Sequence, residues 1–342
     1  MCSAGHSSKR HVEVNSDPVN VVWRGVHVGE AVPMADRWGD GRVSQGRSNA
    51  VDDEVGDGQP VRMARTDDQS AAGRDERVPV VWGSGARTPS ATVRGDVVFK
   101  PAGPWCQAVI DLLHHLERVG FTGAPHVVED GLDEHGRLMV QWVEGTSPHP
   151  QAWTDEGAAR VGVLLRELHD ATKFYVPPAS ARWQATWLRD VRADDVVLSH
   201  CDTGPWNVVG RNGSPQALID WEYAGPVARD VEVAQTAWLN AQLHDDDIAE
   251  LHGLPDADGR ARQLRSILDG YGIPSHRRAS LVDLMIEVAV HGARAEAVSH
   301  SVSAESTAAV AADGYPVMWG IAWRARSASW MLRHQSLLRR AV

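Results

Sequence analysis

Lysine is scarce in this sequence. Only Lys9, Lys100 and Lys173 occur in 342 residues, although Lys and Arg together number 34. Positive charge is therefore carried almost wholly by arginine, a bias that we attribute to genomic base composition. Against that background a lysine in an informative place needs an explanation, and Lys100 directly follows the apolar run VVF.

Cysteine and long apolar runs are also scarce. The three cysteines, Cys2, Cys106 and Cys201, are too few and too scattered for a disulfide framework or a zinc knuckle. The sequence has no run of roughly 18 apolar residues, the length that a membrane-spanning helix needs. Residues 1–10 lack the apolar core of a signal peptide. These absences predict a cytoplasmic protein with no membrane partner.

Acidic residues are in excess, 45 against 34 basic ones, which gives a formal net charge of −11. This charge disfavours a nucleic-acid partner and favours a small cationic ligand. Hydrophobic residues make up 43% and charged residues 23%, as in ordinary globular proteins. The length suits two domains or one bilobal unit.

The amino-acid composition changes along the chain. Residues 1–77 are polar and rich in Gly, Asp, Arg and Ser, a composition that buries too little apolar surface to offset the entropy of ordering. We predict a disordered extension or a misassigned start, with translation beginning near Met34 or Met63. Over 78–143, short apolar runs between glycine-containing turns predict strands, and 144–342 is mainly helical.

One helix is predicted inside the strand-rich part. The stretch CQAVIDLLHHLERVGF places Val109, Leu112, Leu113 and Leu116 on one helical face. A small β-rich lobe followed by a larger α-rich lobe makes the predicted fold class α+β.

The stretch with the most specific chemistry is HCDTGPWN, residues 200–207, followed by LIDWEYAG. Two short β segments joined by the turn GRNGSP predict a hairpin, with Asp202 before its first strand and Asp220 after its second. Phosphoryl transfer needs a base for a hydroxyl proton and oxygen ligands for Mg²⁺, and Asp and Asn supply both. The order His-x-Asp, four residues, Asn207 and then a further Asp matches the catalytic loop and metal-binding Asp of protein kinases.

These motifs resemble the aminoglycoside phosphotransferase and choline kinase family, whose pattern is H-x-D-x-x-x-x-N followed by I-D-W. The segments GDVVFKPAGPW, MVQWVEG and LLRELHDAT also look like the family's nucleotide-facing strand, interlobe linker and helix before the catalytic loop. The resemblance runs from about residue 78 to the C-terminus. It implies a protein-kinase-like bilobal fold, with an N-lobe at 78–143, a C-lobe at 144–342 and a nucleotide in the cleft.

The resemblance implies a phosphotransferase that uses Mg²⁺ and ATP or GTP to phosphorylate a hydroxyl of a small molecule, an aminoglycoside or another amine-bearing alcohol. Carried over residue by residue, it implies that Asp202 is the catalytic base and that Asn207 and Asp220 hold the metal. Lys100, Gln141 and Val143 would contact the nucleotide. His200 and Glu232 would be structural residues of the site.

The sequence departs from the family pattern in the N-lobe and beyond the catalytic hairpin. The glycine-rich loop is reduced to WGSGART. The helix after Lys100 carries Val109 where the family has a glutamate, with Gln107 and Asp111 as the nearest polar residues. Further on, Glu232 or Asp230 stands for an aspartate that braces the catalytic loop. The N-lobe departures motivate an alternative, a pseudokinase-type binding protein without turnover.

Two further hypotheses come from the same loop. His200, Asp202 and Asp220 could serve a metal-dependent hydrolase that needs no nucleotide, although no further ligand cluster accompanies them. Cys201 could be a nucleophile, but the sequence offers it no general base in a recognisable motif.

Two patterns lie in the helical part. The run Asp245–Asp247 precedes a helix and suits an N-cap and the positive end of the helix dipole, or a wall for a cationic substrate. Trp319, Trp323 and Trp330 fall on one helical face, which indicates core packing or a platform for stacking a ring or quaternary amine.

Overall fold

The computed structural model describes residues 76–77, 91–192, 194–311 and 315–342. The predicted extension, apart from the two-residue strand β1 (Glu76–Arg77), lies outside the described residues, and so does WGSGART. The chain divides into two units, Met1–Gln69 and Ser70–Val342, and every described residue belongs to the second.

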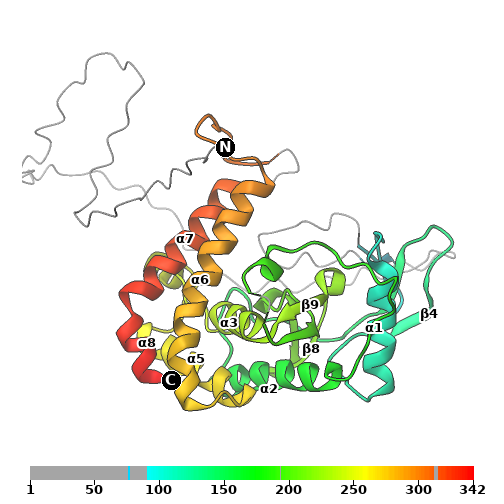
Figure 1. Ribbon diagram of the computed structural model, residues 1–342, viewed down its shortest axis with the longest axis horizontal. Coiled ribbons are helices and arrows are strands. Elements are labelled where there is room, and N and C mark those ends of the chain that lie inside the picture. The colour runs from blue at the N-terminus through cyan, green and yellow to red at the C-terminus, as the bar shows by residue number, and fades with distance from the viewer. Residues whose placement is uncertain (1–75, 78–90, 193, 312–314) are drawn as a thin grey trace, which may run out of the picture. The chain divides into compact units, whose positions relative to one another are not determined.

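The N-lobe is an antiparallel sheet of five strands in the order β1-β2-β3-β5-β4, with one helix packed against β4 (Figure 1). Lys100 ends β3 and pairs with Leu138 at the start of β5. The bounds are β2 (Thr92–Arg94), β3 (Val97–Lys100), β4 (Val127–Leu132), β5 (Leu138–Gln141) and α1 (Cys106–Arg118).

The apolar face predicted for the N-lobe helix is confirmed. Val109, Leu112, Leu113 and Leu116 of α1 are all at most 2% exposed. Burying a side chain of this size contributes about 1.5–3 kcal/mol, so this face fixes α1 against the sheet.

The C-lobe is mainly helical, with two small antiparallel sheets, β6–β9 and β7–β8. Helices α6 and α7 lie side by side along one edge of the lobe (Figure 1). The strands and short 3₁₀ turns are η1 (Trp187–Asp190), β6 (Val196–Ser199), η2 (Pro205–Asn207), β7 (Val208–Arg211), β8 (Ser214–Leu218), η3 (Trp221–Tyr223) and β9 (Gly225–Ala228). The helices are α2 (Asp155–Thr172), α3 (Arg229–Asn240), α4 (Asp246–Leu251), α5 (Ala257–Tyr271), α6 (Ser275–Ser299), α7 (Val317–Arg333) and α8 (Gln335–Ala341).

The α+β, bilobal architecture predicted from the sequence is confirmed. A β-rich lobe with a single helix precedes a lobe of helices, and the stretch HCDTGPWN lies at the small sheets of the second lobe.

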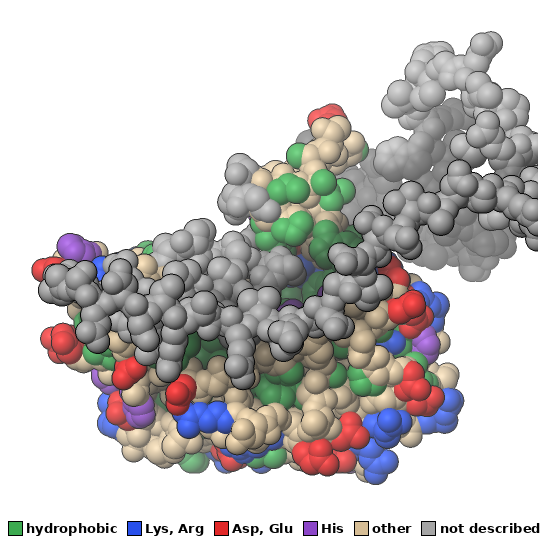
Figure 2. Space-filling view, turned by 180° about the vertical axis from the view of Figure 1, so that it is seen from behind, with side chains coloured by type: hydrophobic (Ala, Val, Ile, Leu, Met, Phe, Trp, Pro, Cys, Tyr) green, Lys and Arg blue, Asp and Glu red, His purple; other side chains and the backbone are tan. Residues whose placement is uncertain are grey.

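The visible surface of the described residues carries charge of both signs. Figure 2 shows acidic and basic side chains interspersed over the visible face of the described residues. Of the helices in the described part of the chain, none combines the length and apolarity that a bilayer crossing requires.

Candidate functional site

The hairpin predicted between the two aspartates is β7–β8. Its turn contains Asn212 and Gly213, both with positive φ (54° and 76°), which suits a tight hairpin turn. The backbone N–H of Ile219 donates to the carbonyl oxygen of Asn207 at 2.9 Å. The hairpin therefore brings the residue before Asp220 directly beside Asn207.

Asp202 and Asn207 are joined within the loop HCDTGPWN. The Asn207 amide nitrogen donates to the Asp202 carboxylate and to the Asp202 carbonyl oxygen, both at 2.9 Å. Because the amide uses its hydrogens on Asp202, its oxygen is the atom that a cation can use.

Asp220 connects the two lobes. Its carboxylate forms an ion pair with the Lys100 ammonium at the end of β3. Asp220 has φ 67° and ψ 62°, a left-handed conformation that costs a non-glycine residue about 1–2 kcal/mol. Strain of this kind persists where the surrounding structure imposes it, and it is frequent at functional sites.

The environment of Asp202 changes its protonation. Burial and the neighbouring Asp220 charge raise the pKa of Asp202 to about 7, although the Asn207 hydrogen bond opposes the shift. A carboxylate with a pKa near the operating pH is suited to accept and return a proton.

The sequence analysis missed one carboxylate, Glu222. It lines the same small cavity as Lys100 and Asp220, whose other walls are mostly apolar. Burial and the Asp220 charge raise the pKa of Glu222, and Lys100 acts in the opposite direction. The only sequence signal for this residue was an acid two places after Asp220.

Helix α1 supplies no acid to this cavity. Its lining residue is Leu113, and Val109 is buried in the core. Gln107 and Asp111 hydrogen-bond to each other at 3.0 Å at exposed positions. Glu222, rather than a residue of α1, therefore provides the second carboxylate beside Lys100.

His200 is buried, and both of its ring nitrogens are used. Nε2 donates to the Ile219 carbonyl oxygen at 2.8 Å, and Nδ1 accepts from the Asp202 backbone N–H at 3.3 Å. Burial lowers the pKa of His200, so the ring is neutral. With no free nitrogen, His200 fixes the loop and does not suit the metal-hydrolase hypothesis.

Glu232 is buried beneath the loop. Its carboxylate accepts from the Cys201 backbone N–H at 2.6 Å and from His169 Nε2 at 2.8 Å. Burial by itself raises the pKa of Glu232, but hydrogen bonds from His169, Ser199 and Cys201 hold it below its usual value. Of the two alternatives for this position, Asp230 instead pairs with Arg277 near the surface.

Comparison with known proteins identifies a relative. No family model matches the sequence. The chain is 48% identical over 258 residues to the trifolitoxin immunity protein of Rhizobium leguminosarum bv. trifolii, an alignment that covers 75% of this chain and 96% of the relative. The chain belongs to the family of this immunity protein. The aligned part is large enough to hold both lobes described above.

Solved structures of small-molecule kinases are more distant from this immunity-family chain. A microcompartment-associated aminopropanol kinase is 14% identical with a TM-score of 0.49, covering 78% of this chain and 94% of the other. Choline kinase from Cryptosporidium parvum is 9% identical with a TM-score of 0.47, covering 78% and 90%. A choline/ethanolamine kinase family protein from Mesorhizobium loti is 14% identical with a TM-score of 0.44, covering 73% and 89%.

The predicted nucleotide contacts of the linker lie at the end of β5 in this immunity-family chain. Gln141 is the exposed last residue of β5, and Val143 is half-buried two residues later. Val140, rather than either of them, lines the cavity beside Lys100. Nucleotide binding by Gln141 and Val143 stays a prediction.

Cys201 is 2% exposed, and burial raises the pKa of its thiol far above the usual value. A thiol in this environment does not form the reactive thiolate. We therefore expect no alkylation of Cys201 when the native protein is treated with iodoacetamide at pH 8. Mass spectrometry of the peptides from the treated protein checks this. Rapid labelling of Cys201 in the folded protein would revive the nucleophile hypothesis.

The carboxylates of Asp245–Asp247 are engaged in ion pairs and do not form an open binding surface for a cationic substrate. Carboxylates of Asp245–Asp247 pair with Arg326 and Arg333 of α7, and the middle one accepts from the Trp330 indole at 2.7 Å. Asp245 occupies the N-cap of α4 without a side-chain cap hydrogen bond. The run therefore fastens α4 to α7.

The tryptophan face of α7 is mostly core. Trp330 is fully buried, and Trp323 stacks on Trp238 with ring centroids 5.5 Å apart. Trp319, nearer the start of α7, is 41% exposed. Core packing is thus confirmed for Trp330 and Trp323.

Proposed function

We propose that this protein is a phosphotransferase that uses Mg²⁺ and ATP or GTP to phosphorylate a hydroxyl of a small molecule. One observation carries the proposal. The Lys100–Asp220 ion pair and the Asp202–Asn207 hydrogen bonds bring four residues from both lobes to one place, in the types that phosphoryl transfer needs.

The donor atoms fit Mg²⁺. This hard cation prefers oxygen ligands, and the Asn207 amide oxygen and the Asp220 carboxylate are such donors. The described residues contain no cluster of three or more His, Cys, Asp or Glu able to hold a metal by themselves. That suits Mg²⁺, which is usually held by one or two carboxylates together with substrate phosphates. Bound there, it would supply positive charge against the phosphate oxygens.

The protein's own groups would divide the remaining work. Asp202 would orient the attacking hydroxyl and accept its proton at a carboxylate oxygen. Lys100 would contact the nucleotide phosphates, and Asp220 holds its ammonium in the cleft before a nucleotide arrives. Gln141 and Val143 would contact the base.

The relative suggests the acceptor. It is named for immunity to a toxin, and phosphorylating a hydroxyl of a toxin is one chemical route to immunity. We therefore propose that the acceptor of this chain is a hydroxyl-bearing toxin, with aminoglycosides and other amine-bearing alcohols as further compounds for a screen. The cytoplasmic location predicted from the sequence would supply the nucleotide.

The test is a thermal melt of the full chain with ATP or GTP, each with and without Mg²⁺. A ligand that binds only the folded state adds about 2.7 kcal/mol of stability at 100 times Kd. We expect a Mg²⁺-dependent rise in Tm that Asp220→Ala abolishes. Asp283→Ala, which removes an exposed carboxylate of α6, is the matched control and should keep the rise. Equal shifts in Asp220→Ala and the unaltered chain would reject the metal assignment.

A second candidate is a nucleotide-binding protein without turnover, favoured by the lack of an acid from α1 beside Lys100. Slow ATP or GTP hydrolysis by the purified chain distinguishes the two. Hydrolysis that stops in Asp202→Asn supports the enzyme. Nucleotide binding without any hydrolysis or transfer supports the second candidate, and hydrolytic activity without nucleotide would return the metal-hydrolase hypothesis.

A further inference from the structure

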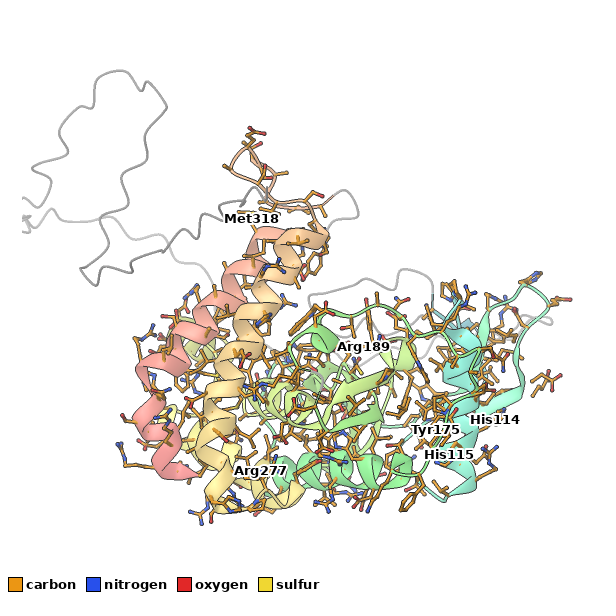
Figure 3. All side chains as sticks on the ribbon, viewed as in Figure 1. His114, His115, Tyr175, Arg189, Arg277 and Met318 are labelled. Carbon is orange, nitrogen blue, oxygen red and sulfur yellow. The ribbon has the colours of Figure 1, made fainter. Side chains whose placement is uncertain are left out.

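Arg189, in the short turn η1, is surrounded by backbone carbonyl oxygens. Its Nε donates to Pro226 O at 2.8 Å, and Nη2 donates to Tyr223 O at 2.7 Å and to Ala224 O at 3.1 Å. Nη1 donates to Gln184 O. In the view of Figure 3, Arg189 lies between the α6–α7 pair and the N-lobe helix α1.

Arg189 differs from its neighbour Arg192 in the groups that it contacts. Within the part of the chain that the structure describes, no carboxylate pairs with Arg189. Arg192, three residues later, makes an exposed ion pair with Glu287 at 2.9 Å. The planar guanidinium has five N–H donors in a fixed arrangement, so it can hold several carbonyl groups at once where a lysine cannot.

Three of these four carbonyl groups, those of Tyr223, Ala224 and Pro226, belong to the chain that follows Asp220. Between Asp220 and β9 the backbone is irregular, with η3 closed by the Ala224 N–H donating to Trp221 O at 3.0 Å. Carbonyl groups in such a segment need partners from elsewhere when they are buried. Arg189 supplies them at Tyr223 and Ala224, the residues that directly follow Glu222.

Gly225 provides independent evidence that the segment is shaped around this side chain. Its φ is 154°, and a Cβ added there would lie 2.4 Å from Arg189 Nη2 and 3.1 Å from the Trp183 ring. Only glycine leaves room for the guanidinium at this point. The arginine and the glycine therefore fit each other, although they lie far apart in the sequence.

We propose that Arg189 is a positioning residue that clamps the 223–226 segment, so that the carboxylates of Asp220 and Glu222, which directly precede it, face Lys100 and the bound nucleotide. The inference rests on the proposed function, because it assigns Arg189 an effect on the metal–nucleotide complex. Arg189 itself is not a catalytic residue, since it hydrogen-bonds to backbone carbonyl oxygens and to the buried Cys201 thiol, none of which is a reacting group.

The test measures nucleotide binding to the full chain by calorimetry over a range of Mg²⁺ concentrations, and without metal in EDTA. Arg189→Lys keeps the positive charge but loses the planar arrangement of N–H donors, whereas Arg189→Gln loses both. Residues that orient metal ligands typically change metal affinity by about 10–100-fold, and we expect both variants to need at least about tenfold more Mg²⁺. Metal-free nucleotide affinity should change less than the Mg²⁺ requirement in both variants, because Lys100 itself is unaltered and no metal ligand is then in use.

Arg192→Lys and Arg192→Gln are the matched controls just after the same turn, and neither should alter the Mg²⁺ requirement. An Arg189→Lys variant that behaves as the unaltered chain would show that charge alone matters and would overturn the clamp. An increased Mg²⁺ requirement in both Arg189 variants, larger than any change in metal-free nucleotide affinity, supports the clamp. General destabilisation would not affect the metal-dependent step alone.

If the Arg189 variants lose a cooperative melting transition, Gly225→Ala decides instead, because it displaces the guanidinium without removing it. An increased Mg²⁺ requirement in Gly225→Ala supports the clamp, and an unchanged one overturns it. Should the unaltered chain bind no nucleotide at any Mg²⁺ concentration, the proposed function fails and this inference with it. Normal binding with unchanged Mg²⁺ dependence in the variants overturns the inference alone.

Discussion

Asp202→Asn will slow phosphoryl transfer by about 10²–10⁴ while leaving Mg²⁺–nucleotide affinity nearly unchanged, because an amide cannot take up the hydroxyl proton. Asn is isosteric with Asp, and the Asn207 amide can still donate to its oxygen as it does to the carboxylate now. The measurements are kcat with the best acceptor and the nucleotide Kd of the same preparation. Retained turnover would remove Asp202 from the mechanism.

The same substitution will stabilise the metal-free protein, and more so at high pH. The pKa of Asp202 is about 7 in the folded protein and about 3.9 in an unfolded chain. Between these values the folded state binds a proton that the unfolded state does not, so stability falls as pH rises from about 4 to about 7. The uncharged amide of the Asp202→Asn variant would escape this loss, which is complete above pH 7.

Melting in EDTA at pH 5 and pH 8 checks this prediction. The Tm difference between Asp202→Asn and the unaltered chain should be larger at pH 8. Asp283→Asn removes an exposed carboxylate and should give similar differences at both values. If Asp202→Asn shows the same difference at pH 5 and pH 8, its carboxylate titrates normally and the buried-base interpretation is wrong.

Glu232→Ala will have the largest effect on stability. Removing one partner of a buried ionic or hydrogen-bonded pair costs about 3–5 kcal/mol. Here the change leaves His169 Nε2 and the Cys201 backbone N–H without their shared acceptor. A typical domain has only about 5–15 kcal/mol to lose, so we expect a much lower midpoint in urea unfolding.

Two variants sharpen the measurement. Glu232→Gln keeps an acceptor for the Cys201 N–H and can still hydrogen-bond to His169, so it should retain most of the stability. Asp230→Ala removes a partly exposed partner of Arg277, a contact worth about 0.2–1 kcal/mol. A Glu232→Ala variant as stable as Asp230→Ala would show that Glu232 does not brace the loop.

The local features of this protein are predictable from its sequence. The turn with Asn212 and Gly213 predicts a hairpin, and the spacing within HCDTGPWN places Asp202 beside Asn207, because these contacts join residues at most a few places apart. The buried face of α1 is readable for the same reason, since its period follows from helix geometry. The division into a β-rich and a helical lobe follows from such local patterns added along the chain.

The meeting of distant residues depends on the packing of whole elements. Lys100 and Asp220 are 120 residues apart and pair because the lobes pack together. The family resemblance predicted a partner carboxylate on α1, whereas packing placed Glu222 beside Lys100 instead. Likewise, nothing in the sequence distinguishes Arg189 from a surface arginine. The fold brings it to the carbonyl groups of Tyr223 and Ala224. Side-chain patterns report period and local turns, but the pairing of remote groups depends on how whole elements pack.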